Sequence, residues 1–131
     1  MAELFYREDR DVDFFNVCER VRSEEKTLSV STIVSKAILK EAKSFYMHPR
    51  EYSSIIRRQG KRFPKNEIKK ALHLEILARY KRLKRENPHL DLPEIAKLIA
   101  EQGAPRFYIS KRRAEDIYYG MLKKPHSKIL T

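Results

Sequence analysis

Apolar residues along this chain recur at helical spacing in six short stretches, which polar or proline-containing segments separate. The first stretch shows the i, i+3, i+4, i+7 spacing of one helix face at Phe14, Val17, Cys18 and Val21. This pattern predicts a helix over roughly 9–23. A matching helix is predicted over roughly 65–86, directly after Pro64, because proline suits the first turn of a helix.

Four more helices are predicted from capping and stop signals. A middle helix starts after Ser29, and its counterpart starts after Asp91, which opens an Asp-x-x-Glu pattern typical of a capping box. Gly103 and the proline two residues later predict the end of that counterpart. The last two helices are predicted to begin near Pro49 and after Ser110.

The second half of the chain repeats the pattern of the first half at an offset of 62 residues. Segment 14–60 aligns with segment 76–122 without a gap, and nine of the 47 aligned positions are identical. One shared phrase is Ala-x-x-Phe-Tyr, which occurs at Ala42, Phe45 and Tyr46 and again 62 residues later. Apolar positions also coincide where the residues differ, which indicates matching buried faces. We interpret the two segments as two copies of one structural unit.

Each copy is expected to form three short helices around one small core. The predicted fold class is therefore all-α, with two copies of a three-helix bundle packed or linked in tandem. We expect the first bundle at residues 1–62 and the second at residues 63–131, together with a basic linker helix and a short C-terminal tail. Units of this size are only marginally stable alone, which gives the two bundles a reason to pack together.

The second and third predicted helices of each copy carry a resemblance to a known class of domains. They lie in "DLPEIAKLIAEQGAPRFYISKRRAEDIYYGML" and in its partner "SVSTIVSKAILKEAKSFYMHPREYSSIIRRQG". This arrangement resembles the tri-helical modules of helix-turn-helix DNA-binding proteins, here in tandem. The resemblance implies that the third helix of each copy enters the major groove while neighbouring elements bind phosphate.

The charge of the chain points to a polyanionic partner. The formal net charge is +11 and the pI is about 9.8. Nucleic acid is the first candidate, an anionic membrane surface is the second, and a basic protein without such a partner is the third interpretation. The apolar stretches are too short to cross a membrane, and no membrane partner is expected. The sequence does not indicate an oligomeric state.

Basic residues of the expected third helices and of the linker are the candidate contacts to DNA. Arg50 and Arg112 occupy matching positions, where arginine can bind guanine with two hydrogen bonds. Tyr46 and Tyr108 either contact nucleic acid or hydrogen-bond to the first helix of their copy. The full set of candidates is Tyr46, Arg50, Arg57, Arg58, Lys61, Arg62, Lys65, Arg106, Tyr108, Lys111, Arg112 and Arg113.

No catalytic pattern stands out, and the chain is not expected to be an enzyme. Its four histidines are scattered, and a single cysteine allows neither an internal disulfide nor a zinc-finger spacing. Cys18 is expected to be buried on an apolar helix face. We expect no metal and no cofactor. The absence of a signal-sequence pattern favours a cytoplasmic protein.

The sequence therefore predicts a non-enzymatic protein that binds double-stranded DNA through the third helix of each copy and the basic linker. Such a protein would act as a transcriptional regulator or as an accessory factor in DNA transactions, of the type that phages or mobile elements carry. Two alternatives remain open, namely a helical adaptor for an acidic protein partner and an RNA-binding protein.

Overall fold

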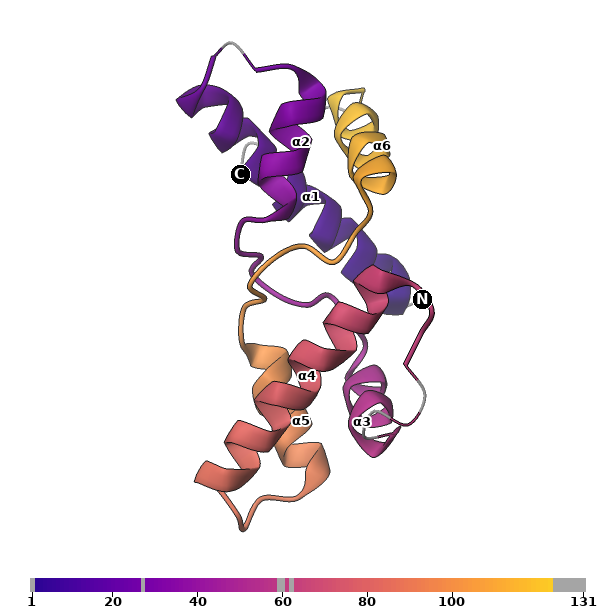
Figure 1. Ribbon diagram of the computed structural model, residues 1–131. Coiled ribbons are helices and arrows are strands. Elements are labelled where there is room, and N and C mark those ends of the chain that lie inside the picture. Colours follow the sequence, from indigo (N-terminus) through magenta and orange to yellow (C-terminus); the bar gives the residue numbers. More distant parts are fainter. Residues whose placement is uncertain (1, 27, 59–60, 62, 124–131) are drawn as a thin grey trace. The chain divides into compact units, whose positions relative to one another are not determined.

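The computed structural model describes residues 2–26, 28–58, 61 and 63–123, and its regular structure is α-helical (Figure 1). The helices are α1 (Ala2–Glu24), α2 (Val30–Ile38), α3 (Pro49–Arg58), α4 (Glu67–Glu86), α5 (Leu92–Glu101) and α6 (Lys111–Leu122). The predicted all-α fold class is confirmed.

The helices begin where the sequence offers a capping side chain. Asn66 Oδ1 accepts hydrogen bonds of 2.9 and 3.0 Å from two backbone N–H groups in the first turn of α4. Asp91 and Glu94 form a complete capping box at α5, as predicted. Ser110 Oγ accepts a hydrogen bond of 3.1 Å from the backbone N–H of Arg113 at α6, also as predicted. These contacts satisfy donors that a helix start leaves without a partner inside the helix.

The helix boundaries recur at the 62-residue offset of the sequence. α1 ends at Glu24 and α4 at Glu86, whereas α2 begins after Ser29 and α5 after Asp91. α3 and α6 also begin 62 residues apart. The clearest difference from the prediction is the start of α1 at Ala2 rather than near residue 9, because the residues between hold no glycine or proline that would end a helix.

The six helices form two compact units, and each unit contains helices from both halves of the chain. In unit 1, which comprises the described parts of residues 1–46 and 104–131, α1, α2 and α6 pack against one another in pairs. In unit 2, which comprises the described parts of residues 47–103, α3, α4 and α5 pack in the same way. Each unit is therefore a three-helix bundle.

This grouping differs from the predicted division into residues 1–62 and 63–131. The prediction placed α3 with α1 and α2, whereas α6 is the helix that packs on them. The physical reason is that α3 and α6 carry similar apolar faces, on which the buried Ile55 and Ile117 occupy matching positions. Either helix could complete the bundle by its apolar pattern, so the pattern did not reveal which one does.

The core of unit 1 lies between α1, α2 and α6. Phe14 is fully buried, and its ring meets that of Phe107 edge to face with 5.1 Å between the centroids. Tyr118 of α6 packs its ring against Phe15 of α1 at a centroid distance of 5.4 Å, and its hydroxyl donates a hydrogen bond of 3.2 Å to Glu19. These contacts attach the C-terminal helix to the N-terminal one.

Two connecting segments of unit 1 pair through their backbones. Ala42 and Ala104 exchange two N–H···O hydrogen bonds, both 2.9 Å long. The N–H of Phe107 donates a third bond of 2.9 Å to the carbonyl oxygen of Ile38. The chain that leaves α2 is thereby joined to the chain that enters α6.

The core of unit 2 is built from aliphatic residues and one tyrosine. Its fully or almost fully buried side chains are Tyr52, Ile56, Ile76, Ile95 and Ile99. They come from all three helices of the unit, so the apolar faces of α3, α4 and α5 meet in one cluster. The charged residues of the unit lie mainly on its exposed surface.

Candidate nucleic-acid interface

The end of α3 and the start of α4 present a group of exposed cations on unit 2, which we call the basic corner. Its members are Arg57, Arg58, Lys61, Lys65, Lys69 and Lys70, all with exposed side chains. Between residues 57 and 70 the only acidic residue is Glu67. The local charge is therefore strongly positive, as contacts to phosphate require.

Cations from both helices of the basic corner affect the pKa of one histidine, His73. Burial lowers the pKa of His73 on α4, and the charges of Arg58 and Lys69 lower this pKa further. Arg58 belongs to α3 and Lys69 to α4. Arg58 and Lys69 therefore both act on His73, and their helices pack against each other within unit 2.

The start of α6 in unit 1 carries a second group of exposed cations, at Lys111, Arg112 and Arg113. No acidic residue lies in the first turn of this helix. Because the helix dipole already makes this end positive, three cations there repel one another and the dipole, and a bound anion would relieve the repulsion. Arg50 holds the matching position on α3 in unit 2, also exposed, next to the acidic Glu51.

Tyr46 has a structural contact to the first helix. Its hydroxyl donates a hydrogen bond of 2.6 Å to Asp13 Oδ2, and the backbone N–H of Lys43 donates one of 2.9 Å to the same oxygen. Asp13 is only 5% exposed. Burial raises the pKa of Tyr46, and the hydrogen bond to Asp13 raises it further. The interpretation of Tyr46 as a tyrosine hydrogen-bonded to the first helix is confirmed.

The backbone of Tyr46 is held in an unusual conformation. Its φ angle is 58°, in the left-handed region that a residue with a side chain seldom adopts. The N–H of Tyr46 donates a hydrogen bond of 3.0 Å to Ser44 Oγ, and the hydroxyl is tied to Asp13. These contacts offset the strain of the left-handed backbone at Tyr46.

The ring of Tyr108 contacts two other side chains of unit 1. Its ring stacks on Phe45 at a centroid distance of 6.0 Å, and the guanidinium of Arg106 lies 5.5 Å from the ring centroid. Arg106 Nε also donates a hydrogen bond of 3.1 Å to the carbonyl oxygen of Phe107. A nucleic-acid base that stacked on Tyr108 would have to compete with these contacts.

The structure brings the candidate residues together in two groups. Unit 1 holds Tyr46, Arg106, Tyr108, Lys111, Arg112 and Arg113, and unit 2 holds Arg50, Arg57, Arg58, Lys61 and Lys65. Arg62 lies outside the described residues. Among the described candidates, the lysines and the arginines other than Arg106 have exposed side chains, so they are open to a partner.

Unit 2 is the more basic of the two units. Residues 47–103 hold 14 basic and seven acidic residues, a net charge of +7, whereas the residues of unit 1 hold 15 and 11, a net charge of +4. Not every cation of unit 2 is open, since the guanidinium of Arg79 is mostly buried against Glu75, Gln102 and Gly103. Sequence reasoning missed this structural role of Arg79.

Asp13 is the other residue that sequence reasoning missed. It occupies a position beside Phe14 on a helix face that is otherwise apolar, and this placement of a carboxylate was the signal available in the sequence. A buried carboxylate must find hydrogen-bond donors, and Asp13 finds them in Lys43 and Tyr46.

Cys18 is fully buried in unit 1, as predicted. Burial, with a smaller effect of the charge of Glu19, raises the pKa of its thiol from 9.0 to about 12. In the described part of the chain, no group of three or more His, Cys, Asp or Glu side chains is placed to hold a metal ion. Within those same residues, no helix is long and apolar enough to cross a membrane.

No protein-family model, no curated protein sequence and no solved structure matches this chain significantly. The fold and the charge distribution are therefore the observations on which function can be argued.

Proposed function

We propose that the protein binds double-stranded DNA without catalysing a reaction, and that it acts in the cytoplasm as a regulator or accessory factor in DNA transactions. The observation that carries the proposal is the basic corner of unit 2, where the ends of two helices and the segment between them present six exposed cations. Such clusters supply the phosphate contacts that dominate affinity for DNA.

The starts of α3 and α6 add residues suited to contact the bases. Arg50 and Arg112 are exposed in the first turns of these helices. An arginine at such a position can donate two hydrogen bonds to guanine. Such a contact favours guanine over the other bases by about 1–3 kcal/mol. Lys111 and Arg113, the neighbours of Arg112 on α6, would then bind phosphate.

We further propose that α1–α3 and α4–α6 arose by duplication of one three-helix segment. The coincidence of helix boundaries and buried apolar positions at the 62-residue offset supports this origin. A duplicated segment would offer two similar DNA-contacting helices on one chain, and linked contacts bind more tightly than separate ones.

A binding titration tests the proposal. The full-length protein is titrated with random duplex DNA of about 20 base pairs, with single-stranded DNA and with RNA of the same length, at several salt concentrations. We expect duplex DNA to bind tightest, with an affinity that falls steeply as salt rises. Equal affinity for the three nucleic acids would favour RNA or non-specific binding. Weak, salt-independent binding to all of them would refute the proposal and favour the acidic protein partner.

A further inference from the structure

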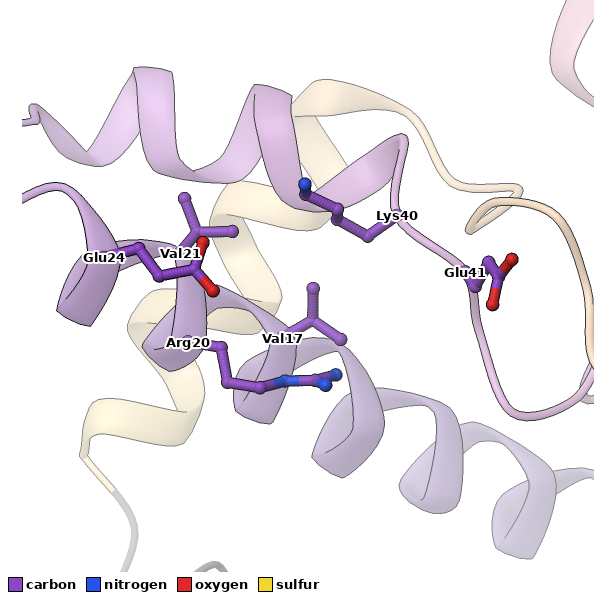
Figure 2. Close-up of a pocket in the computed structure, with 6 residues that line it drawn as sticks. All are labelled: Val17, Arg20, Val21, Glu24, Lys40 and Glu41. Atoms are coloured by element: carbon purple, nitrogen blue, oxygen red, sulfur yellow. The ribbon is translucent and has the colours of Figure 1, made fainter.

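Unit 1 contains a pocket of about 270 Å³ between α1 and the segment that follows α2 (Figure 2). Val17 and Val21 form its apolar floor, and both are almost fully buried. Four charged residues complete the lining, namely Arg20, Glu24, Lys40 and Glu41, and their side chains are exposed. The pocket thus combines an apolar floor with two positive and two negative groups.

The matching place in unit 2 is filled by the chain itself. Val17 corresponds to Arg79 at the 62-residue offset, and Arg79 lies against the end of α5. Its guanidinium donates hydrogen bonds of 3.0 Å to Gln102 Oε1 and 2.8 Å to the carbonyl oxygen of Gly103. Only 13% of this side chain is exposed. In unit 2, therefore, one long polar side chain occupies the space between the two helices.

The sequence of unit 1 differs at all three of these positions. Val17 stands in place of Arg79, Lys40 in place of Gln102, and Glu41 in place of Gly103. The valine leaves the space open, and the other two changes place a cation and a carboxylate beside it. An occupant that complements this lining would carry charges of both signs beside an apolar group.

The four charged side chains are available for such an occupant. Among the described residues, none forms a hydrogen bond or ion pair with the side chain of Arg20, Glu24, Lys40 or Glu41, although Ser23 Oγ donates to the backbone carbonyl oxygen of Arg20. A volume of about 270 Å³ is slightly smaller than the roughly 300–1,000 Å³ of pockets for drug-sized molecules. A small molecule of amino-acid size is the better fit.

We propose that this pocket binds an aliphatic α-amino acid. The carboxylate of the ligand accepts hydrogen bonds from Lys40 and Arg20, and its ammonium group donates to Glu24, which lies at the Val21 end of the lining (Figure 2). The aliphatic side chain covers Val17 and Val21. Each charged contact is a charge-assisted hydrogen bond, so both ends of the ligand contribute to the affinity. This site is independent of the proposed DNA contacts, and its test uses no DNA.

The test follows the valine methyl groups of the full-length protein by NMR during a titration with L-leucine. All five valines lie in unit 1, so Val17 and Val21 report on the pocket, while Val30 and Val34 on α2 serve as internal references. We expect saturable shifts at Val17 and Val21 only. Absence of shifts, or equal shifts at the reference valines, would overturn the proposal.

Two analogues test whether both charges matter. 4-Methylpentanoate lacks the ammonium group of leucine, and 3-methylbutylamine lacks its carboxylate. Each should bind about tenfold more weakly or worse, because a lost charge-assisted hydrogen bond is worth about 1.5–3 kcal/mol. If either analogue binds as tightly as L-leucine, the assignment to an α-amino acid is wrong.

Substitutions that copy residues of unit 2 into unit 1 provide the matched controls. Val17→Arg with Lys40→Gln recreates the Arg79–Gln102 pair and should fill the pocket, so L-leucine should no longer shift Val21. Lys40→Gln alone, at an exposed position, should weaken binding about tenfold without disturbing the fold. Unchanged binding in Lys40→Gln would contradict the proposal even if the double variant failed to fold.

Discussion

The two units are both three-helix bundles, yet they use the corresponding acidic residue of their long helix in different ways. In unit 1, Asp13 on α1 is buried and accepts hydrogen bonds from Tyr46 and from the backbone of Lys43. In unit 2, the matching Glu75 on α4 is about one-third exposed and pairs with Arg79 four residues later. One acid anchors a connecting segment, whereas the other belongs to an ion pair along its own helix. Similar apolar faces thus coexist with different polar contacts.

Replacing each acid by alanine should give the largest difference in the free energy of unfolding between the two units. Asp13→Ala removes the buried acceptor of two partly buried hydrogen bonds, so we expect the free energy of unfolding to fall by about 2–4 kcal/mol. Glu75→Ala breaks a partly exposed pair and should cost less than about 1 kcal/mol. Urea denaturation of both variants measures the difference. Equal losses would show that the buried contact of Asp13 does not stabilise the fold.

The local structure of this chain was predictable because its signals lie close together in the sequence. The apolar face from Phe14 to Val21 indicated α1, and the capping box at Asp91 indicated the start of α5. Gly103 marked the end of α5. Such signals act within one or two helical turns, so they need no knowledge of the rest of the fold.

The partners of the helices were not predictable from these signals. Periodicity identifies which face of α6 is buried, but the similar face of α3 allows the same packing on α1 and α2. Of the candidate site, the exposed cations were found from charge alone. The contact of Tyr46 with Asp13 remained one of two alternatives, because it joins residues 33 positions apart through an unusual backbone turn.

The pH dependence of stability should differ between the units. The pKa of Cys18 in unit 1 is raised from 9.0 to about 12, so the unfolded chain ionises first as the pH rises. The contribution of Cys18 to the free energy of unfolding should be constant below about pH 8.5 and lower by about 1–2 kcal/mol at pH 10.5. The pKa of His73 in unit 2 is lowered, so this group costs stability as the pH falls below 6.5. Urea denaturation across this pH range gives both slopes.

Two single variants test whether Cys18 causes the loss of stability at alkaline pH and His73 the loss at acid pH. Cys18→Ala should reduce the alkaline loss, and His73→Gln should reduce the acid loss, each without changing the other. If Cys18→Ala leaves the alkaline slope unaltered, groups other than this thiol control it. The pKa of Tyr46 is also raised, so part of the alkaline loss should persist in the cysteine variant.

Charge reversal compares the two basic surfaces. Arg58→Glu in the basic corner and Arg112→Glu on α6 should each weaken binding to duplex DNA about tenfold at low salt and reduce the salt dependence. Lys97→Glu on α5 and Lys123→Glu after α6 make the same change at other exposed positions and should have smaller effects. Fluorescence anisotropy with labelled duplex measures all four. A large effect of a control variant would mean that only net charge matters.

The last prediction concerns a change that should have almost no effect on assembly. A specific protease site inserted between residues 60 and 61 allows the native chain to be cut into its two halves. Because α6 packs on α1 and α2, and α3 packs on α4 and α5, each unit then contains helices from both fragments. We expect the cut protein to leave a size-exclusion column at the volume of the uncut one and to separate only in denaturant. Two fragments that separated under native conditions would mean that each half folds on itself, as the periodicity of the sequence alone had suggested.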